Sequence, residues 1–220
     1  MRLRPRPARV ALAAAAVLAA LALAAVLASS GGNGSRERAG RGTVSAGRGS
    51  RFEGAPLPGG VSAPGFALRD QEGRRVWLGE FRGRVVVLTF LYSTCGAPCV
   101  LIAQQIRGAL DELRGEHVRA PAVLIVSADP AADTRRRVAR FLAEASLTGR
   151  ARYLTGSRRS LRRIWRAYGV RPASDGRAAF AQYASVLLID GSGAERVLYQ
   201  SEQLTPEALS HDVATLERSG

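Results

Sequence analysis

A continuous apolar stretch runs from Val85 to Tyr92 and is followed closely by two cysteines, Cys95 and Cys99. Its β-branched and aromatic residues do not alternate with polar ones, which is typical of a central strand that is buried on both faces. After Pro98 the apolar positions recur every three or four residues, which predicts an amphipathic helix. The pattern therefore predicts a buried strand, a short turn and a helix that carries Cys99 in its first turn.

The remaining pattern predicts an α/β fold. A hairpin over residues 66–78, with its turn at 70–73, precedes the central strand. After the cysteine helix we expect, in order, a strand at 122–127, a helix capped by Asp133 or Thr134, an extended piece at 153–154, a helix at 157–168, strands at 183–190 and 195–200, and a helix from Pro206. This order indicates a mixed central sheet flanked by helices, which is a thioredoxin-like layout. Sites in such sheets form beyond the strand ends, where both cysteines fall.

The N-terminal 28 residues have the pattern of an export signal. Four arginines and no acid lie within residues 1–9, and residues 10–28 consist only of Ala, Leu and Val. A helix of that length spans about 28 Å, enough to serve as a single-pass anchor. The small residues before Ser29 also suit cleavage as a signal peptide. In both cases the arginines predict that everything after Ala28 lies on the extracytoplasmic side, and as an anchor the segment would hold the chain at the cell membrane.

Residues 29–60 are rich in Gly, Ser, Arg and Pro and have few large apolar side chains. This composition predicts a flexible linker, because such a segment cannot bury a core. Residues 61–220 are long enough for one sizeable core, so we expect a single domain there.

The net charge of the chain is +14, and its positive charges are all arginines, since the chain contains no lysine. Residues 1–51 alone hold nine arginines and one acid. The arginines are scattered over predicted helix faces with little aromatic interleaving, so we expect no nucleic-acid binding. The N-terminal charge suits contact with anionic lipid head groups.

Cys95 and Cys99 carry the candidate chemistry. Unpaired N–H groups and the helix dipole favour a thiolate at a helix N-terminus, which makes the sulfur nucleophilic and able to bind metals. The spacing allows a disulfide or a shared metal ion. A purely stabilising bridge is the alternative, but a bridge across so short a loop removes little unfolded-state entropy. Asp129, which follows the next strand, is a candidate either for influencing the thiols or for capping its own turn.

At this point the chain resembles the SCO/SenC family, whose members have a thioredoxin fold, are anchored in membranes and help to assemble the copper centre of cytochrome c oxidase. The resemblance covers residues 64–199. It rests on residues 66–73, 81–90, Thr94-Cys95-Gly96-Ala97-Pro98-Cys99, 127–134, 154–156, 168–170 and 188–190. The implied partner is the apo copper-binding subunit of a respiratory oxidase.

The resemblance implies copper binding by Cys95, Cys99 and a histidine, but Gln182 stands where that histidine is expected. The two histidines, His117 and His211, fall elsewhere, and Met1 is the only methionine. Two thiolates alone can hold Cu(I), whereas Cu(II) prefers a nitrogen ligand. The missing histidine thus weakens the prediction that the protein carries copper, whereas both cysteines needed for dithiol chemistry are present.

Three functions follow from these residues. The first is a membrane-tethered thiol–disulfide oxidoreductase in which Cys95 attacks a partner disulfide and Cys99 resolves the mixed disulfide. The second is a copper metallochaperone that binds Cu(I) through both cysteines. The third is a thiol peroxidase, which the motifs disfavour. Peroxiredoxins have a proline ahead of a Thr-x-x-Cys unit, whereas Cys95 directly follows Thr94, and glutathione peroxidases have a Trp-Asn pair, whereas Arg166 follows Trp165.

Overall fold

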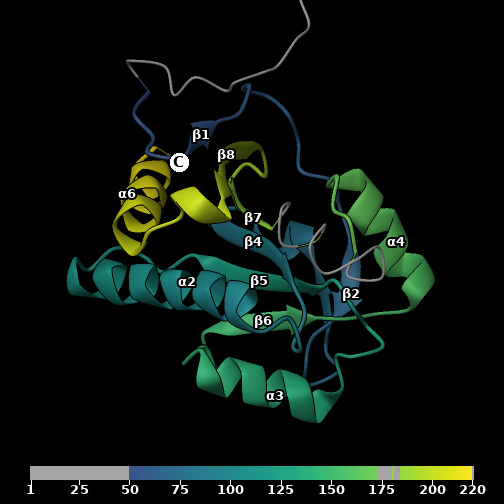
Figure 1. The fold of residues 1–220 in the computed structure, drawn as a ribbon. Helices are drawn as coiled ribbons and strands as arrows, with labels where there is room; N and C mark the ends of the chain where they lie inside the picture. The colour runs from purple at the N-terminus through teal and green to yellow at the C-terminus, as the bar shows by residue number, and fades with distance from the viewer. Residues whose placement is uncertain (1–49, 173–179, 181–183, 220) are drawn as a thin grey trace, which may run out of the picture. The chain divides into compact units, whose positions relative to one another are not determined.

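The computed structural model describes residues 50–172, 180 and 184–219. The strands are β1 (Ala55–Pro56), β2 (Ala67–Arg69), β3 (Arg75–Trp77), β4 (Val86–Leu91), β5 (Ala122–Ser127), β6 (Ala151–Leu154), β7 (Ser185–Ile189) and β8 (Glu195–Gln200). The helices are α2 (Ala97–Gly115), α3 (Arg135–Glu144), α4 (Arg158–Ala167) and α6 (Pro206–Glu217), with short 3-10 turns η1 (Leu78–Phe81) and η3 (Ser201–Gln203). Figure 1 shows the helices arranged around a sheet.

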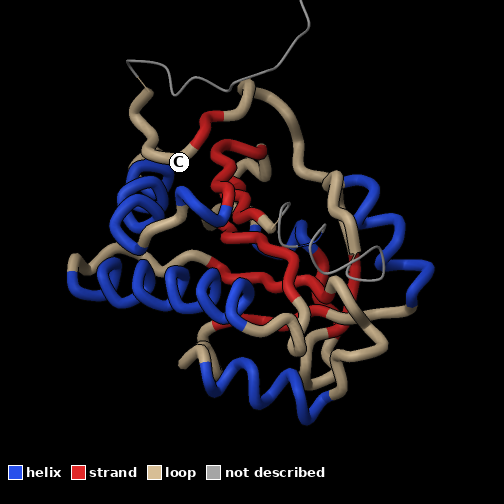
Figure 2. The backbone as a smooth tube through the Cα atoms, in the orientation of Figure 1, coloured by secondary structure: helices blue, strands red, loops and turns tan. Residues whose placement is uncertain are grey.

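The main sheet has six strands in the order β1-β8-β7-β4-β5-β6, and β2 and β3 form the predicted hairpin as a separate sheet. Strand β4 pairs in parallel with β5 and antiparallel with β7, so the main sheet is mixed. Figure 2 shows the strands in red and the surrounding helices in blue. The predicted α/β, thioredoxin-like architecture is confirmed. Because β4 is hydrogen-bonded on both sides, the point where it ends is firmly placed.

All six residues of β4 are buried, which explains its unbroken apolar run. Val87 and Leu91 face a core formed with α2, α3 and α6. Val86 and Leu88 face a second core, which α4 and the β2–β3 hairpin cover. Each fully buried aliphatic side chain contributes roughly 1.5–3 kcal/mol, so packing on both faces holds the strand in place.

The sheet includes residues from the predicted linker, since β1 pairs with β8. Just before β1, a Cβ added at Gly54 would lie 2.5 Å from Val197 Cγ1 and 2.7 Å from Tyr199 Cζ. The backbone N–H groups of Glu53 and Gly54 donate to the buried Asp212 carboxylate of α6 at 2.9 and 3.0 Å. Gly54, which leaves room for close approach to β8, and the Asp212 carboxylate, far away in the sequence, thus fix this segment to the domain.

In the part of the chain that the structure describes, no helix has the length and apolar character needed to cross a bilayer. The predicted signal or anchor at residues 1–28, and residues 29–49 of the predicted linker, lie outside the described residues.

We predict that Asp212→Asn lowers the free energy of unfolding by about 2–4 kcal/mol, because it weakens the buried acceptor for two backbone N–H groups and the Tyr199 hydroxyl. Chemical denaturation measures this change. Glu202→Gln removes the same charge from an exposed position and should shift stability by less than about 0.5 kcal/mol. Equal effects of the two substitutions would contradict the assignment.

Candidate redox site

Cys95 and Cys99 lie between the end of β4 and the first turn of α2, as the sequence predicts. They form a disulfide with an S–S distance of 2.06 Å and a Cα–Cα distance of 5.7 Å. The Cys95 N–H donates to the carbonyl of Tyr92 at 3.1 Å, which closes a turn after the strand. Gly96 precedes α2 with φ +82°, ψ −149°, a conformation that only glycine adopts without strain. The turn therefore brings both sulfurs to the helix N-terminus.

The two cysteines differ in exposure. Cys99 is fully buried against the core, whereas Cys95 is partly exposed. Residues 96–98 are exposed as well, and Leu101, on the first turns of α2, is 51% exposed. No charged residue occurs between positions 91 and 106. The more accessible cysteine is thus the one that precedes the helix, in a stretch of sequence without charged side chains.

A buried carboxylate holds the loop that leads to Cys95. Asp133, at the start of the α3 region, accepts a hydrogen bond from the Ser93 N–H at 2.7 Å. Its second oxygen accepts from the Ser127 hydroxyl at 2.6 Å and from the Tyr153 hydroxyl at 2.7 Å. The loop after β4, strand β5 and strand β6 therefore all donate to one carboxylate. This holds the loop at Ser93, two residues before Cys95.

Burial and the neighbouring Asp133 charge raise the pKa of Tyr153 well above its ordinary value. The phenol therefore stays protonated and remains a hydrogen-bond donor to Asp133. Asp133 and Tyr153 are not among the residues that the sequence pattern predicts at the site. The sequence offers Asp133 or Thr134 as the cap of the helix after β5, and Thr134 takes that role. An aspartate freed from capping is a weak signal for Asp133, and no local signal exists for Tyr153.

Asp129, the acid that the sequence proposes near the thiols, accepts from the N–H groups of Ala131 and Ala132 at 3.2 and 3.3 Å. The sequence left two roles open for Asp129, influencing the thiols or capping its own turn, and its contacts are those of the turn cap. His117 follows the far end of α2, and His211 contacts Asp212 on α6 at 3.0 Å.

Within the described residues, no group of three or more His, Cys, Asp or Glu side chains could hold a metal ion. Gln182, at the expected ligand position, lies outside them. The two sulfurs, which lie close enough to bond, offer one soft ion two thiolates when reduced, a donor set that suits Cu(I).

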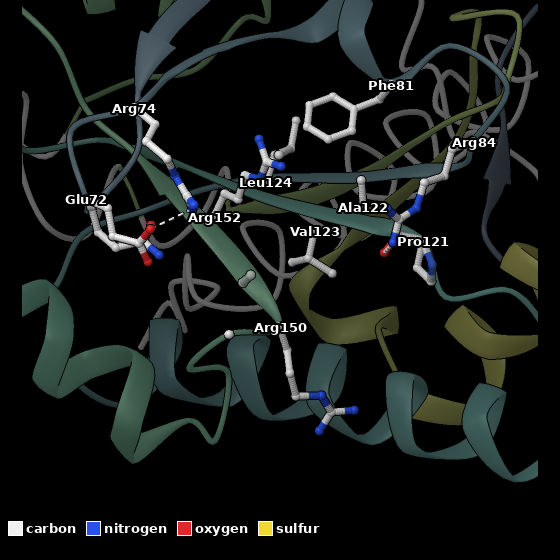
Figure 3. A pocket seen from close by; sticks show the side chains of 13 residues that line it. Glu72, Arg74, Phe81, Arg84, Pro121, Ala122, Val123, Leu124, Arg150 and Arg152 are labelled. Atoms are coloured by element: carbon white, nitrogen blue, oxygen red, sulfur yellow. Dashed lines mark hydrogen bonds and ion pairs between the residues drawn. The ribbon is translucent and has the colours of Figure 1, made fainter.

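A cavity of about 300 Å³ lies at the amino-terminal ends of β5 and β6 (Figure 3). Cys95 follows the carboxyl-terminal end of β4, which is parallel to β5, so the cavity and the cysteine lie at opposite ends of these strands. The lining of the cavity is rich in arginine, but each guanidinium is already held within the protein. Arg84 donates to the carbonyls of Ala120 and Pro121. The ion pairs are Arg74 with Glu72, Arg150 with Asp111 and Arg152 with Glu80, at 2.6–2.7 Å. This cavity is a structural part of the domain.

The fold and the cysteine pair define a thioredoxin-like protein with a CxxxC dithiol between a central strand and a helix. The SCO1/SenC family model matches residues 58–217, and the chain belongs to that family. None of the curated protein sequences compared with the chain matches it.

Three solved structures have the same fold. The first is BsSco, a member of the Sco family of cytochrome c oxidase assembly proteins in which a disulfide switch was identified; it is 20% identical, with a TM-score of 0.62 over 74% of this chain and 98% of its own. Copper-bound ScoI of Arabidopsis thaliana is 19% identical, with a TM-score of 0.60 over 73% of this chain and 100% of its own. Apo Sco1 of Thermus thermophilus is 22% identical, with a TM-score of 0.60 over 77% and 99%.

We predict that Asp133→Asn increases hydrogen exchange at the Ser93 amide by at least about tenfold, because hydrogen bonds to charged acceptors contribute roughly 1.5–3 kcal/mol. Mass-spectrometric or NMR exchange measurements report the change. Asp129→Asn is the matched control, since its acceptor serves only its own turn. Unaltered exchange at Ser93 in Asp133→Asn would show that the carboxylate does not hold the loop.

Proposed function

We propose that the chain is a thiol–disulfide oxidoreductase that reduces the cysteines of an apo copper-binding subunit of a respiratory oxidase before metal is inserted. The observation that carries this proposal is the Cys95–Cys99 disulfide, in which one cysteine is partly exposed and the other is buried. Such a pair suits an attacking thiol and a resolving thiol. The choice of partner rests on membership of the SCO1/SenC family.

The reaction begins with the reduced dithiol. The Cys95 thiolate attacks one sulfur of the partner disulfide, forms a mixed disulfide and releases the partner's other sulfur as a thiolate. The Cys99 thiolate then attacks the Cys95 sulfur and releases the second partner thiolate. Two electrons pass to the partner, its thiolates take up two protons, and the protein is left with the Cys95–Cys99 disulfide found in the structure.

The position of Cys99 supports its role in the second step. It lies in the first turn of α2, where the N–H groups and helix dipole favour negative charge on sulfur, and no acidic residue lies in that turn. The Asp133 hydrogen bond to Ser93 limits the movement of the loop that carries Cys95.

We place this activity on the extracytoplasmic side of the cell membrane. The basic start and the apolar segment at residues 10–28 support a tether or an export signal there. Disulfide chemistry also suits that compartment, because the cytoplasm keeps thiols reduced.

We predict that Cys95→Ser abolishes reduction of an oxidised partner subunit and that Cys99→Ser accumulates the mixed disulfide. Non-reducing gel electrophoresis and thiol quantification follow both products. His117→Gln, which changes a residue beyond the far end of α2, should leave the rate unchanged. Reduction of the partner by Cys95→Ser at the rate of the unchanged protein would refute the assignment.

Cu(I) carriage is a second candidate, favoured by the adjacency of the two sulfurs. The copper-bound ScoI structure supports it as a relative with the same fold. In this chain copper would be cargo held by Cys95 and Cys99 in their reduced form.

We predict that anaerobic titration of the reduced protein shows one Cu(I) bound per chain and that Cys99→Ala abolishes this binding. Because Cu(II) prefers nitrogen ligands, Gln182→His should add Cu(II) binding that the unchanged chain lacks. Spectroscopic titration with each ion measures both effects. Failure of the reduced chain to bind Cu(I) would exclude carriage without affecting the dithiol reaction.

A further inference from the structure

A hollow of about 190 Å³ lies beside the loop that carries the attacking cysteine. Its lining comes from that loop and from α3: Ser93, Thr94, Arg137, Arg140, Phe141 and Glu144. Ser93 and Thr94 immediately precede Cys95 in the sequence, so the hollow adjoins the loop that carries the reacting sulfur. The hollow is therefore placed to contact the molecule that Cys95 attacks.

The charges that line the hollow are two guanidiniums and one carboxylate. Arg137 donates through Nη1 to the carbonyl of Ala132 at 3.2 Å, which leaves its other N–H groups available. Arg140 forms no ion pair in the described part of the chain, although Glu144 is one helical turn away. Both arginines and Glu144 are exposed, so the hollow carries a net positive charge that an incoming anion can meet.

Ser93 also lines the hollow. Its Oγ is buried and has no hydrogen-bond partner among the described residues, so it is closed to an incoming group in this structure. The two guanidiniums are therefore the donors that an incoming acceptor can reach, and they outnumber the single carboxylate of the lining, that of Glu144.

We propose that this hollow binds a carboxylate of the polypeptide whose disulfide Cys95 attacks, so that the protein prefers partners with an acidic residue next to the reactive cysteine. The inference rests on the thiol–disulfide activity proposed above. A planar carboxylate matches the paired N–H groups of a guanidinium, and the volume accommodates a side chain rather than a whole domain. The sequence from Leu91 to Ile106 offers no charged side chain, so the arginines of α3 supply the charge recognition.

The test uses the reduced full-length protein and three peptides, each with one cysteine activated as a neutral 2-pyridyl disulfide. The peptides differ only in the residue next to that cysteine, which is Glu, Gln or Lys. The Cys95 thiolate attacks the peptide sulfur, the Cys95–peptide disulfide forms, and pyridine-2-thione leaves with the electron pair of the broken S–S bond. Release of pyridine-2-thione gives the second-order rate constant.

We expect the Glu peptide to react about fivefold faster than the Gln peptide, and the Lys peptide to react slowest. Arg140→Gln and Arg137→Gln should each reduce the Glu preference to about twofold or less. Arg136→Gln is the matched control, because it removes the same charge from an exposed position on α3 that does not line the hollow. It should retain the preference.

The outcomes separate the two proposals. Equal rates with all three peptides, or a Glu preference that survives in Arg137→Gln and Arg140→Gln, would overturn the carboxylate site while leaving the oxidoreductase intact. No reaction of the reduced protein with any peptide would instead refute the proposed function. Circular dichroism of each variant confirms that the compared proteins are folded.

Discussion

The hydrogen bond from the Ser93 N–H to the Asp133 carboxylate is the contact on which the geometry of the site depends. Strand β4 is fixed by its neighbours on both sides, but its hydrogen-bonded pairing ends before the cysteines. Asp133 extends that order by two residues, to the position just before Thr94-Cys95. Because Ser127 and Tyr153 also donate to this carboxylate, the loop is tied to β5 and β6 as well as to its own strand.

This arrangement places the Cys95–Cys99 disulfide just beyond the end of the central strand β4. The same turn holds one cysteine in the core and leaves the other partly exposed, so the two sulfurs are suited to different steps of one exchange reaction. Residues 91–106 contain no charged side chain, while two arginines of α3 line a small hollow together with Ser93 and Thr94. In the proposed reaction, chemistry and recognition thus come from adjacent elements that Asp133 links.

The elements with strong local patterns could be predicted from the sequence. The apolar run of β4, the residues of β5 and the position of Cys99 in the first turn of α2 all agree with the structure. Contacts between distant segments could not be predicted. Residues 55–56 have a linker-like composition, yet they join the sheet because Gly54 permits close approach and Asp212, more than 150 residues away, accepts its N–H.

The same limit applies to the site. Asp129 and Asp133 both follow β5, and no local pattern tells which of them reaches the cysteine loop. The structure gives that role to Asp133, because its carboxylate lies under the loop while Asp129 serves its own turn. Gln182, which the family resemblance aligns with a histidine ligand, lies outside the described residues, so its place at the site is a prediction from the sequence.

The most direct test of the central claim is the redox equilibrium of the cysteine pair in the folded protein, read by alkylation and mass spectrometry in glutathione buffers of graded potential. The account predicts one reversible two-electron transition between disulfide and dithiol, with Cys95 alkylated faster than Cys99 in the reduced form. A disulfide that is reduced only when the protein unfolds, or a reduced form in which Cys99 reacts first, would contradict it.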